Sequence, residues 1–344
     1  MRRRSRYSGR PRAATPWRSP SRYYSCAPSG ALPHFRGVSK VNLSVVLCTH
    51  NRASRLGRAL ESLSELDVPA GLDWELLVVD NNSTDGTRTV IEQVAAGARL
   101  PCRYLFEPSL GKSFALNAGI ARALGRVLAF TDDDVTFDRG WLRGLLAAFD
   151  APDCAGVGGQ IVPVWPASPP RWFSATGPYR LLPAVVGYQF DTSGPVIRPP
   201  YGANMAYRRQ MFERYGLFRT DLGPRGREMI RGEDTEFGLR LLAGGERVVY
   251  VPGAIVYHPV EPERMRFRYF EQYYFGEGRM QIRAFPLPPG TVRWLGIPRY
   301  CYRGFVEHLF KWGTSLNPRA RAFHRLSGWM VLGNMFEAWR QGRQ

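Results

Sequence analysis

RVLAFTDDDV, residues 126–135, is the stretch that decides the fold. Val127–Phe130 is a continuous apolar run, which is typical of a strand buried on both faces of a parallel sheet. Asp132, Asp133 and Asp134 follow where the strand leaves the sheet, and ligands of open α/β sheets bind outside the carboxyl ends of the strands. A divalent cation offsets the repulsion between such carboxylates. The segment therefore predicts a Mg²⁺ or Mn²⁺ site, with a solvated acidic turn as the alternative.

The chain before this stretch alternates predicted strands with predicted helices. Short apolar runs predict strands at 41–48, 74–79 and 102–106. Helices are expected between these strands. The helical spacing of Leu56, Leu60 and Leu63 predicts the first, and the other two are expected at 87–96 and 113–124. This alternation predicts a parallel sheet of βα units, the architecture of a Rossmann-like nucleotide-binding half.

The net charge of +18 is concentrated at the two ends of the chain. Residues 1–40 carry +10 and residues 264–344 carry another +10, which leaves −2 for residues 41–263. A nucleic-acid-binding domain would place basic residues on a folded groove. The distribution argues against nucleic acid as a partner and favours an anionic surface, such as acidic lipid, at the flanks.

No run approaches the 18 apolar residues of a membrane-spanning helix. The Arg-rich segment 1–40 lacks the apolar core of a secretory signal, and we expect it to be a disordered basic tail. The five cysteines are widely spaced, which argues against a disulfide framework or a zinc site. These features predict a cytoplasmic protein, and peripheral contact with the inner face of the cell membrane stays open.

Four segments together resemble a known family: SVVLCTHNR at 44–52, LVVDNNSTDGT at 77–87, GKSFALNAGIARALGRVLAFTDDD at 111–134 and GEDTEFGLR at 232–240. In this order they are similar to the bacterial, non-processive, inverting glycosyltransferases of family 2, which have the GT-A fold. The resemblance covers roughly residues 41–262. It implies a nucleotide-sugar half at 41–135 and an acceptor half at 136–262. A basic, aromatic helical extension at 263–344 would follow.

The resemblance implies a donor site at the ends of the first two strands. Thr49 and Asn51 would contact the base or ribose, and Arg52 would face a phosphate. Asp80 would contact the nucleobase or ribose, with a turn cap as its alternative role. Lys112 would help to hold the diphosphate, although a surface lysine at a helix start also fits the sequence. Its GKS tripeptide is not a P-loop, because the motif lacks its first glycine.

The same resemblance assigns the metal and the catalytic base. Asp134 would ligate a divalent metal, Mg²⁺ or Mn²⁺, and Asp132 would lie near the ribose or a metal-bound water. His258 would complete the metal site, since neutral imidazole is a good ligand. Asp234 would take the proton of the acceptor hydroxyl, and Glu233 would hold the acceptor or orient the base. An acidic helix N-terminus is the structural alternative for both acids.

Four further expectations concern Asp133 and the acceptor half. Asn204 would bond the sugar, or serve a structural role, and Asp133 would point away from the ligand because extended side chains alternate. The Pro-, Gly- and Trp-rich segment 151–200 predicts loops with aromatic surfaces, over the acceptor or in the core. Arg247–Tyr257 predicts two short strands joined at Pro252-Gly253.

The extension 263–344 interleaves arginine with aromatic residues. Such amphipathic segments suit a membrane interface, and helices packed on the catalytic domain are the alternative. The Gln-x-x-Arg-Trp signature of processive synthases is missing, because Gln272 is followed by Tyr-Tyr-Phe-Gly. This departure argues for transfer of a single sugar.

The predicted function is therefore metal-dependent, inverting transfer of one sugar from a nucleoside-diphosphate sugar, with UDP first among the nucleotides. The acceptor would be a glycan or a lipid-linked glycan of the cell envelope or a polysaccharide. Two alternatives stay open: a nucleotidyltransferase acting on sugar phosphates, and a non-enzymatic protein that binds anionic polymers. The first would need a Gly-rich loop after the first strand, and residues 49–52 contain no glycine.

Overall fold

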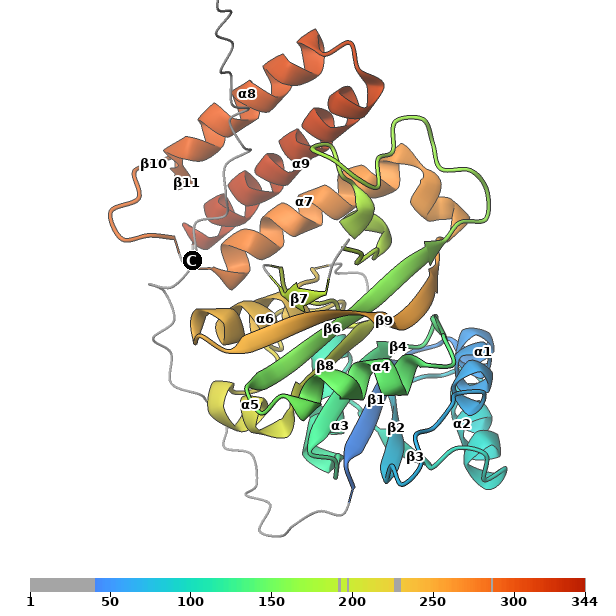
Figure 1. The fold of residues 1–344 in the computed structure, drawn as a ribbon. Coiled ribbons are helices and arrows are strands. Elements are labelled where there is room, and N and C mark those ends of the chain that lie inside the picture. The colour runs from blue at the N-terminus through green and yellow to red at the C-terminus, as the bar shows by residue number, and fades with distance from the viewer. Residues whose placement is uncertain (1–40, 191–192, 197, 226–229, 286, 344) are drawn as a thin grey trace, which may run out of the picture.

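A computed structural model describes residues 41–190, 193–196, 198–225, 230–285 and 287–343. The predicted disordered tail at 1–40 lies outside the described residues. Figure 1 shows a central sheet with helices on its faces and a layer of long helices, from α7 to α9, at one end. The mixed α/β architecture is the GT-A arrangement predicted from the sequence, with helices at the C-terminal end.

The first half of the sheet consists of parallel strands in the order β3-β2-β1-β4. The strands are β1 (Leu43–Thr49), β2 (Trp74–Asp80), β3 (Cys102–Phe106) and β4 (Val127–Asp132). The helices between them are α1 (Ala53–Ser64), α2 (Thr87–Ala96) and α3 (Lys112–Arg122). Thr49 pairs with Asp80, and Cys48 pairs with Asp132. The strands β1, β2 and β4 therefore end level with one another, and the polar residues at their ends share one edge of the sheet.

The second half of the sheet continues in the order β8-β6-β9-β5, with β8 antiparallel to β4. Its strands are β5 (Thr136–Phe137), β6 (Cys154–Val164), β7 (Gly194–Pro195), β8 (Asn204–Arg208) and β9 (Arg247–Pro259). The accompanying helices are α4 (Trp141–Ala147), α5 (Arg209–Tyr215) and α6 (Glu233–Ala243).

The expectation of two short strands at Arg247–Tyr257 is wrong, because β9 is one continuous strand of 13 residues. Its register against β6 shifts between Gly159 and Gln160, which pair with Val251 and Ile255. Pro252 and Gly253 lie in this irregularity. A β-bulge accommodates residues that would otherwise end a strand.

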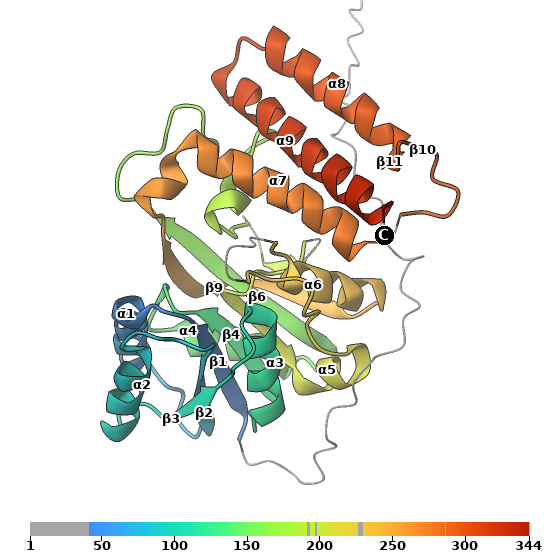
Figure 2. The ribbon, with the colours of Figure 1, turned by 180° about the vertical axis from the view of Figure 1, so that it is seen from behind.

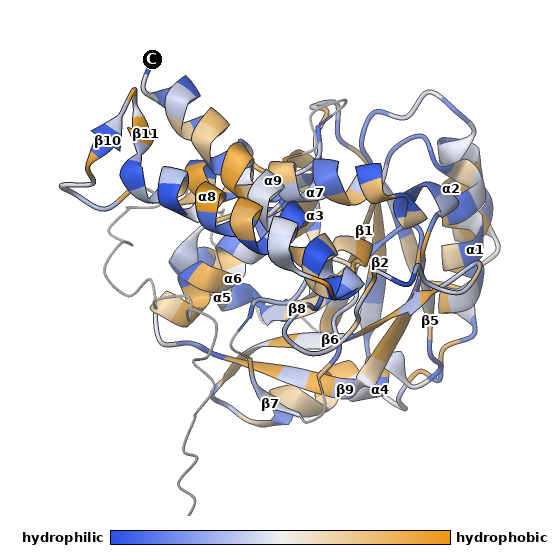
Figure 3. Cartoon of the chain, turned by 90° about the horizontal axis from the view of Figure 1, so that it is seen from above, coloured by the Kyte–Doolittle hydropathy of each residue, from blue (hydrophilic) through white to orange (hydrophobic). Residues whose placement is uncertain are grey.

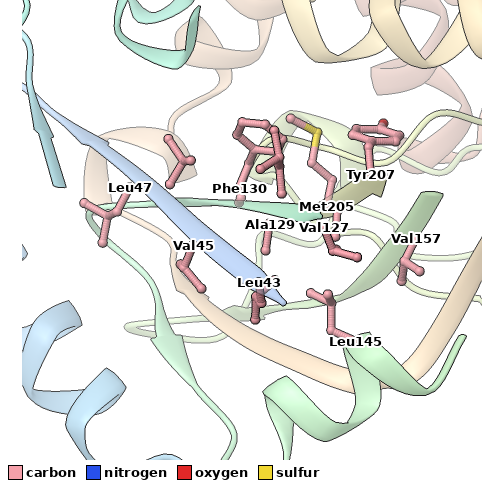
Figure 4. Packing of buried hydrophobic residues seen from close by; sticks show 14 of the residues in the cluster. Leu43, Val45, Leu47, Val127, Ala129, Phe130, Leu145, Val157, Met205 and Tyr207 are labelled. Atoms are coloured by element: carbon pink, nitrogen blue, oxygen red, sulfur yellow. The ribbon is translucent and has the colours of Figure 1, made fainter. Parts of the chain in front are cut away.

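The main core lies on both faces of the sheet and contains the apolar run of β4. Leu128, Ala129 and Phe130 are fully buried, as expected for a central strand. Figure 4 shows Phe130 beside Met205 of β8 on one side of the strands, and Val45 of β1 on the other side. Such packing fixes the ends of the strands, and with them the site described below.

The C-terminal layer consists of three helices: α7 (Phe267–Ala284), α8 (Arg299–Thr314) and α9 (Pro318–Gln341). A short hairpin, β10 (Arg293–Trp294) and β11 (Ile297–Pro298), precedes α8. The layer covers one end of the sheet, and α8 lies on its outer side (Figure 2). No helix in the described ranges has the length and apolarity needed to cross a membrane.

A second apolar cluster joins this layer to the Trp-rich segment. Phe173 and Phe270 are buried with their ring centroids 6.0 Å apart, and the Trp172 ring lies 4.9 Å from that of Phe270. The tryptophans of the 151–200 segment are therefore half-buried packing residues. Of the two roles left open for them, the structure shows the core role.

Candidate functional site

The polar residues expected at the donor site converge on one edge of the sheet. They come from the ends of β1, β2, β4 and β9 and from the starts of α3 and α6: Thr49, Asn51, Arg52, Asp80, Lys112, Asp132, Asp133, Asp134, Glu233, Asp234 and His258. Hydrogen bonds and ion pairs link neighbours within this set. The elements separate these residues widely in sequence, and the parallel register of β1, β2 and β4 brings them together.

Asp133 lies at the end of β4 and points into the site. The alternation rule predicted that it would point away. It is 4% exposed and accepts hydrogen bonds from the Thr49 hydroxyl at 2.7 Å and from Arg52 at 2.8 Å. Residues 133–134 form a turn and are not extended strand, so the alternation no longer applies. Burial is the main cause that raises the pKa of Asp133, against the effect of Arg52.

Asp134 lies between two arginines and a histidine. Its Oδ2 is 3.1 Å from Arg52 and 3.9 Å from Arg55, and its Oδ1 is 3.6 Å from Nε2 of His258. Sequence reasoning missed Arg55, which also pairs with Glu261 at 3.0 Å. Its position one turn after Arg52 on α1 was the available signal, because residues three apart share a helix face.

Asp134 and His258 fit a divalent cation. His258 is 2% exposed, and burial is the main cause that lowers its pKa, so the imidazole is neutral and able to act as a ligand. Within the part of the chain that is described, no three His, Cys, Asp or Glu side chains form a metal cage. Magnesium commonly uses one or two protein ligands and completes its shell with substrate phosphates and waters. A pair is therefore sufficient for a cation that arrives with a diphosphate.

Lys112 is a half-buried ion-pairing residue and not the surface lysine that the sequence also allowed. Its ammonium donates a 2.5 Å hydrogen bond to Asp132. Burial opposes its charge, but Asp132, Glu233 and Asp234 together raise its pKa. The ion pair also lowers the pKa of Asp132, although burial acts in the other direction. Lys112 thus keeps a positive charge between the acids of β4 and the acids of α6.

The first two residues of α6 are the acids expected to act in catalysis. Asp234 is half-buried, and its Oδ2 accepts a 2.8 Å hydrogen bond from the backbone N–H of Gly202. Its Oδ1 accepts one from the N–H of Thr235 at 2.6 Å. These bonds fix the orientation of the carboxylate at the start of α6.

Glu233 is 3% exposed, and burial followed by the charge of Asp234 raises its pKa to about 7. The two adjacent acids therefore differ in environment. One is held by backbone donors, and the other is buried and inclined to keep its proton.

The β2 end is a hydrogen-bonded turn. Asp80 is 2% exposed, accepts a 2.9 Å bond from the N–H of Ser83, and accepts a 3.1 Å bond from the Tyr104 hydroxyl. The turn cap named as its alternative role is therefore present, and a base or ribose contact stays a prediction. Asn51 has φ 51° and accepts a 2.7 Å bond from the N–H of Thr84, which ties the two loops together.

Asn204 does not join the site, and its predicted bond to the sugar is corrected here. Its side chain is fully buried, accepts from Trp141 Nε1 at 2.9 Å, and donates to the carbonyls of Gln160 and Ala254 at 2.9 and 2.8 Å. Protein partners therefore use both N–H donors and the oxygen of the amide. Asn204 holds β6, β8 and β9 together, the structural role that the sequence had left open.

Comparison with known proteins agrees with this geometry. The profile of "Glycosyl transferase family 2" matches residues 44–216. A succinoglycan biosynthesis protein, ExoM, of Rhizobium meliloti is 27% identical over 71% of this chain and 75% of its own. A glucosyl-dolichyl phosphate glucuronosyltransferase of Haloferax volcanii is 27% identical over 69% of this chain and 75% of its own.

Solved structures share the fold. A mannosyltransferase from Pyrobaculum calidifontis, in complex with GDP-Man and Mn²⁺, superposes with a TM-score of 0.53 at 19% identity, over 88% of this chain and 73% of its own. The enzyme GalNAc-T7, with UDP, GalNAc and Mn²⁺, gives a TM-score of 0.52 at 18% identity, over 73% and 52%. At these identities the likeness speaks for the GT-A fold alone.

Proposed function

The chain belongs to glycosyl transferase family 2, and on that premise we propose that it transfers one sugar from a nucleoside-diphosphate sugar to an acceptor hydroxyl, with inversion. The enzyme class is glycosyltransferase, which replaces the nucleotidyltransferase and the non-enzymatic alternatives. One observation carries the finer proposal. Lys112 bonds to Asp132 at the end of β4, and its ammonium lies near Asp234 at the start of α6, which supports a donor site next to a general base.

We assign the donor diphosphate to the β4 side of the site. Asp134 and His258 would hold a divalent cation with Asp132 nearby, and that cation would supply Lewis-acid stabilisation of the departing diphosphate. Arg52 and Lys112 add positive charge next to these acids. Both side chains retain partial exposure, at 40% and 23%, so both are within reach of an incoming ligand.

We assign the nucleoside to the turn between the ends of β1 and β2. Asn51 is exposed there, and the buried carboxylate of Asp80 and the hydroxyl of Thr49 shape the floor. UDP is the first nucleotide to test, followed by GDP. Solved structures of the same fold were obtained with UDP and with GDP-Man.

Asp234 is the proposed general base. The acceptor hydroxyl oxygen forms a bond to the anomeric carbon while its proton passes to the Asp234 carboxylate. The bond from the anomeric carbon to the diphosphate oxygen breaks on the opposite face, and its electron pair leaves with the diphosphate. The Gly202 and Thr235 N–H groups hold the Asp234 carboxylate in position before the reaction.

The acceptor is proposed to be a glycan or a lipid-linked glycan of the cell envelope. The relatives with succinoglycan biosynthesis and glucosyl-dolichyl phosphate in their names support this class. Because the Gln-x-x-Arg-Trp signature is absent at Gln272, transfer of a single sugar is favoured over polymerisation.

We propose that α8, the outer helix of the C-terminal layer, contacts a membrane. Four apolar side chains define what we call the α8 surface: Val306 (63% exposed), Leu309 (49%), Phe310 (69%) and Leu316 (98%). Exposed basic residues surround it: Arg293, Arg299, Arg303, Lys311 and Arg319. Hydrophobic and hydrophilic segments alternate along α8 in Figure 3. Apolar side chains among cations match an anionic bilayer surface.

The test is a thermal-shift and donor-hydrolysis panel of UDP-, GDP- and dTDP-sugars, with and without Mn²⁺. We expect one nucleotide to stabilise the wild type in a metal-dependent manner, and Asp134→Ala to lose that effect. Asp234→Asn should keep donor binding and lose transfer, by a factor on the order of 10²–10⁴. If no nucleotide sugar stabilises the wild type at millimolar concentration, the proposed donor class is wrong.

A further inference from the structure

A small pocket lies between the start of α6 and the C-terminal helix α7, outside the donor site. Its enclosed volume is about 70 Å³, and it is lined by Arg231, Tyr269, Gln272, Tyr273, Gly276 and Glu277. One water needs about 10–15 Å³ by this measure, so the cavity has room for several polar groups of a ligand. Five of the six lining residues belong to α7.

Several polar groups around the pocket have no partner within the described ranges. The Glu277 carboxylate and the hydroxyls of Tyr201, Tyr273 and Tyr274 take part in no hydrogen bond or ion pair with any described residue. Arg231 pairs with no acid there; it donates a 3.5 Å hydrogen bond to the Tyr269 hydroxyl, and its guanidinium lies over the Tyr273 ring at 5.3 Å. What we call the α7 cage consists of five of these residues: Tyr201, Arg231, Tyr273, Tyr274 and Glu277. The Glu277 carboxylate and the three tyrosine hydroxyls therefore keep hydrogen-bonding capacity that a ligand can use.

The α7 cage adjoins the proposed general base. Tyr201 directly precedes Gly202, whose N–H holds Asp234. A Cβ on Gly232 would lie 2.6 Å from Met280 Cγ, so α7 packs directly on the turn before Asp234. Burial raises the pKa of Glu277 to about 7, with the charge of Asp234 as the next cause.

The chemistry of the α7 cage favours a neutral carbohydrate over an anion. Arg231 and Glu277 balance each other, and Asp234 adds negative charge nearby, so a phosphate would meet repulsion. Sugar hydroxyls instead donate to a carboxylate and accept from a guanidinium or a tyrosine hydroxyl. Tyrosine rings cover the apolar face of a sugar, while their hydroxyls bond to its edge.

We propose that the α7 cage is the acceptor subsite and binds a neutral sugar residue of the acceptor, which rests on the glycosyltransferase function proposed above. Glu277 accepts hydrogen bonds from the sugar hydroxyls, and the rings of Tyr273 and Tyr274 cover its face. The C-terminal layer then forms part of the site, because α7 supplies three of the five cage residues. The acceptor hydroxyl is thereby placed beside Asp234.

The experiment is saturation-transfer-difference NMR on the full chain with Mn²⁺ and UDP or GDP. The probes are methyl α- and β-glycosides of glucose, galactose, mannose and N-acetylglucosamine at millimolar concentration. At least one glycoside should give signals with the wild type, and Glu277→Gln and Tyr273→Phe should lose them. The nucleotide signals should persist in both variants, because the α7 cage lies outside the donor site.

Glu271→Gln is the matched control, since Glu271 is on the same helix but pairs with Arg325 of α9 at 2.7 Å. It should keep the sugar signals. Thermal unfolding midpoints within a few degrees of wild type identify folded variants, and Tyr273→Phe retains the ring. Sugar signals that survive Glu277→Gln, or no sugar signal from any glycoside with the wild type, would overturn the α7 cage. Absence of nucleotide signals would instead count against the proposed donor.

Discussion

The ammonium of Lys112 donates a hydrogen bond of 2.5 Å to the carboxylate of Asp132. This contact joins the first residue of α3 to the last residue of β4. A Cβ on Gly202 would lie 3.2 Å from the same nitrogen and 3.6 Å from Asp234 Oδ2, so the base and the ammonium are neighbours. One cation therefore serves two groups of acids, which would otherwise repel one another.

Lys112→Met should lower kcat/KM by on the order of 100-fold, because it removes a preorganised charge from a partly buried site. It should also raise the pH at which transfer reaches its maximum. Loss of the cation raises the pKa of Asp132 and of Glu233, each of which Lys112 lowers in the wild type. The measurement is transfer rate against pH with the preferred donor.

Lys311→Met is the control for that substitution, since Lys311 forms an exposed ion pair with Glu307 on α8. Its rate and pH profile should match wild type. An unchanged pH profile in Lys112→Met would show that Lys112 does not set the ionisation of the neighbouring acids.

His258→Gln should raise the Mn²⁺ concentration for half-maximal activity by roughly 10–100-fold. The substitution removes the imidazole that lies 3.6 Å from Asp134, while an amide of similar size keeps the packing. Chelation of the metal should abolish wild-type transfer, and added Mn²⁺ or Mg²⁺ should restore it. The measurement is a metal titration of transfer, with His308→Gln on α8 as the control. Equal metal requirements in wild type and His258→Gln would rule out the histidine as a ligand.

Glu233 should make folding stability depend on pH. Its folded pKa is about 7, against 4.5 for an ordinary glutamate, so the folded chain holds this proton more tightly than the unfolded chain. The stability from this group is complete below the unfolded pKa and is lost as pH rises through the folded pKa. Glu233→Gln should therefore reduce the fall in Tm between about pH 5 and pH 8.

Differential scanning fluorimetry at a series of pH values measures this effect. Glu92→Gln on the exposed face of α2 is the control and should leave the wild-type slope unchanged. A steeper loss of Tm in Glu233→Gln than in wild type would contradict the assigned direction of the pKa shift.

The local patterns were sufficient to predict the parallel half of the fold. The predicted segments 87–96 and 102–106 coincide with α2 and β3, because these elements follow from apolar periodicity and turn residues alone. The continuous β9 could not be predicted in the same way. Pro252 and Gly253 are local breakers, and the bulge that accommodates them depends on pairing with β6.

The site residues also differ in whether local sequence patterns could predict their positions. Residues that follow a strand, such as Thr49 and Asp134, could be placed from the sequence because strand ends share an edge. Asn204 was misplaced, since its hydrogen bonds to β6 and β9 are tertiary. Glu277 could not be found at all. Its neighbours Tyr201 and Asp234 are remote in sequence, and only the docking of α7 brings them near.

The crossing of α7 and α9 should tolerate no side chain at Gly278. A Cβ there would overlap the backbone oxygen of Met330, and one at Gly333 would overlap that of Phe275. Gly278→Ala should lower stability by about 1–3 kcal/mol, because backbone atoms cannot move aside as side chains do. Chemical denaturation measures the loss. Gly304→Ala is the control, since its Cβ would meet Val331 at an ordinary 3.8 Å. Equal stability of both variants would contradict the close crossing.

Phe310→Glu should reduce binding to anionic vesicles by roughly tenfold, if the α8 surface rests on a bilayer. The side chain is 69% exposed, and its removal takes an aromatic ring out of the interface and adds a charge that anionic lipid repels. The measurement is co-sedimentation with phosphatidylglycerol-containing vesicles. Wild-type binding should weaken with salt, because Arg303 and Lys311 supply attraction that counter-ions screen.

Phe106→Glu is the control, since that ring is 47% exposed on β3, outside the α8 surface. Full binding by Phe310→Glu, or no wild-type binding at low salt, would leave the α8 surface without a membrane role.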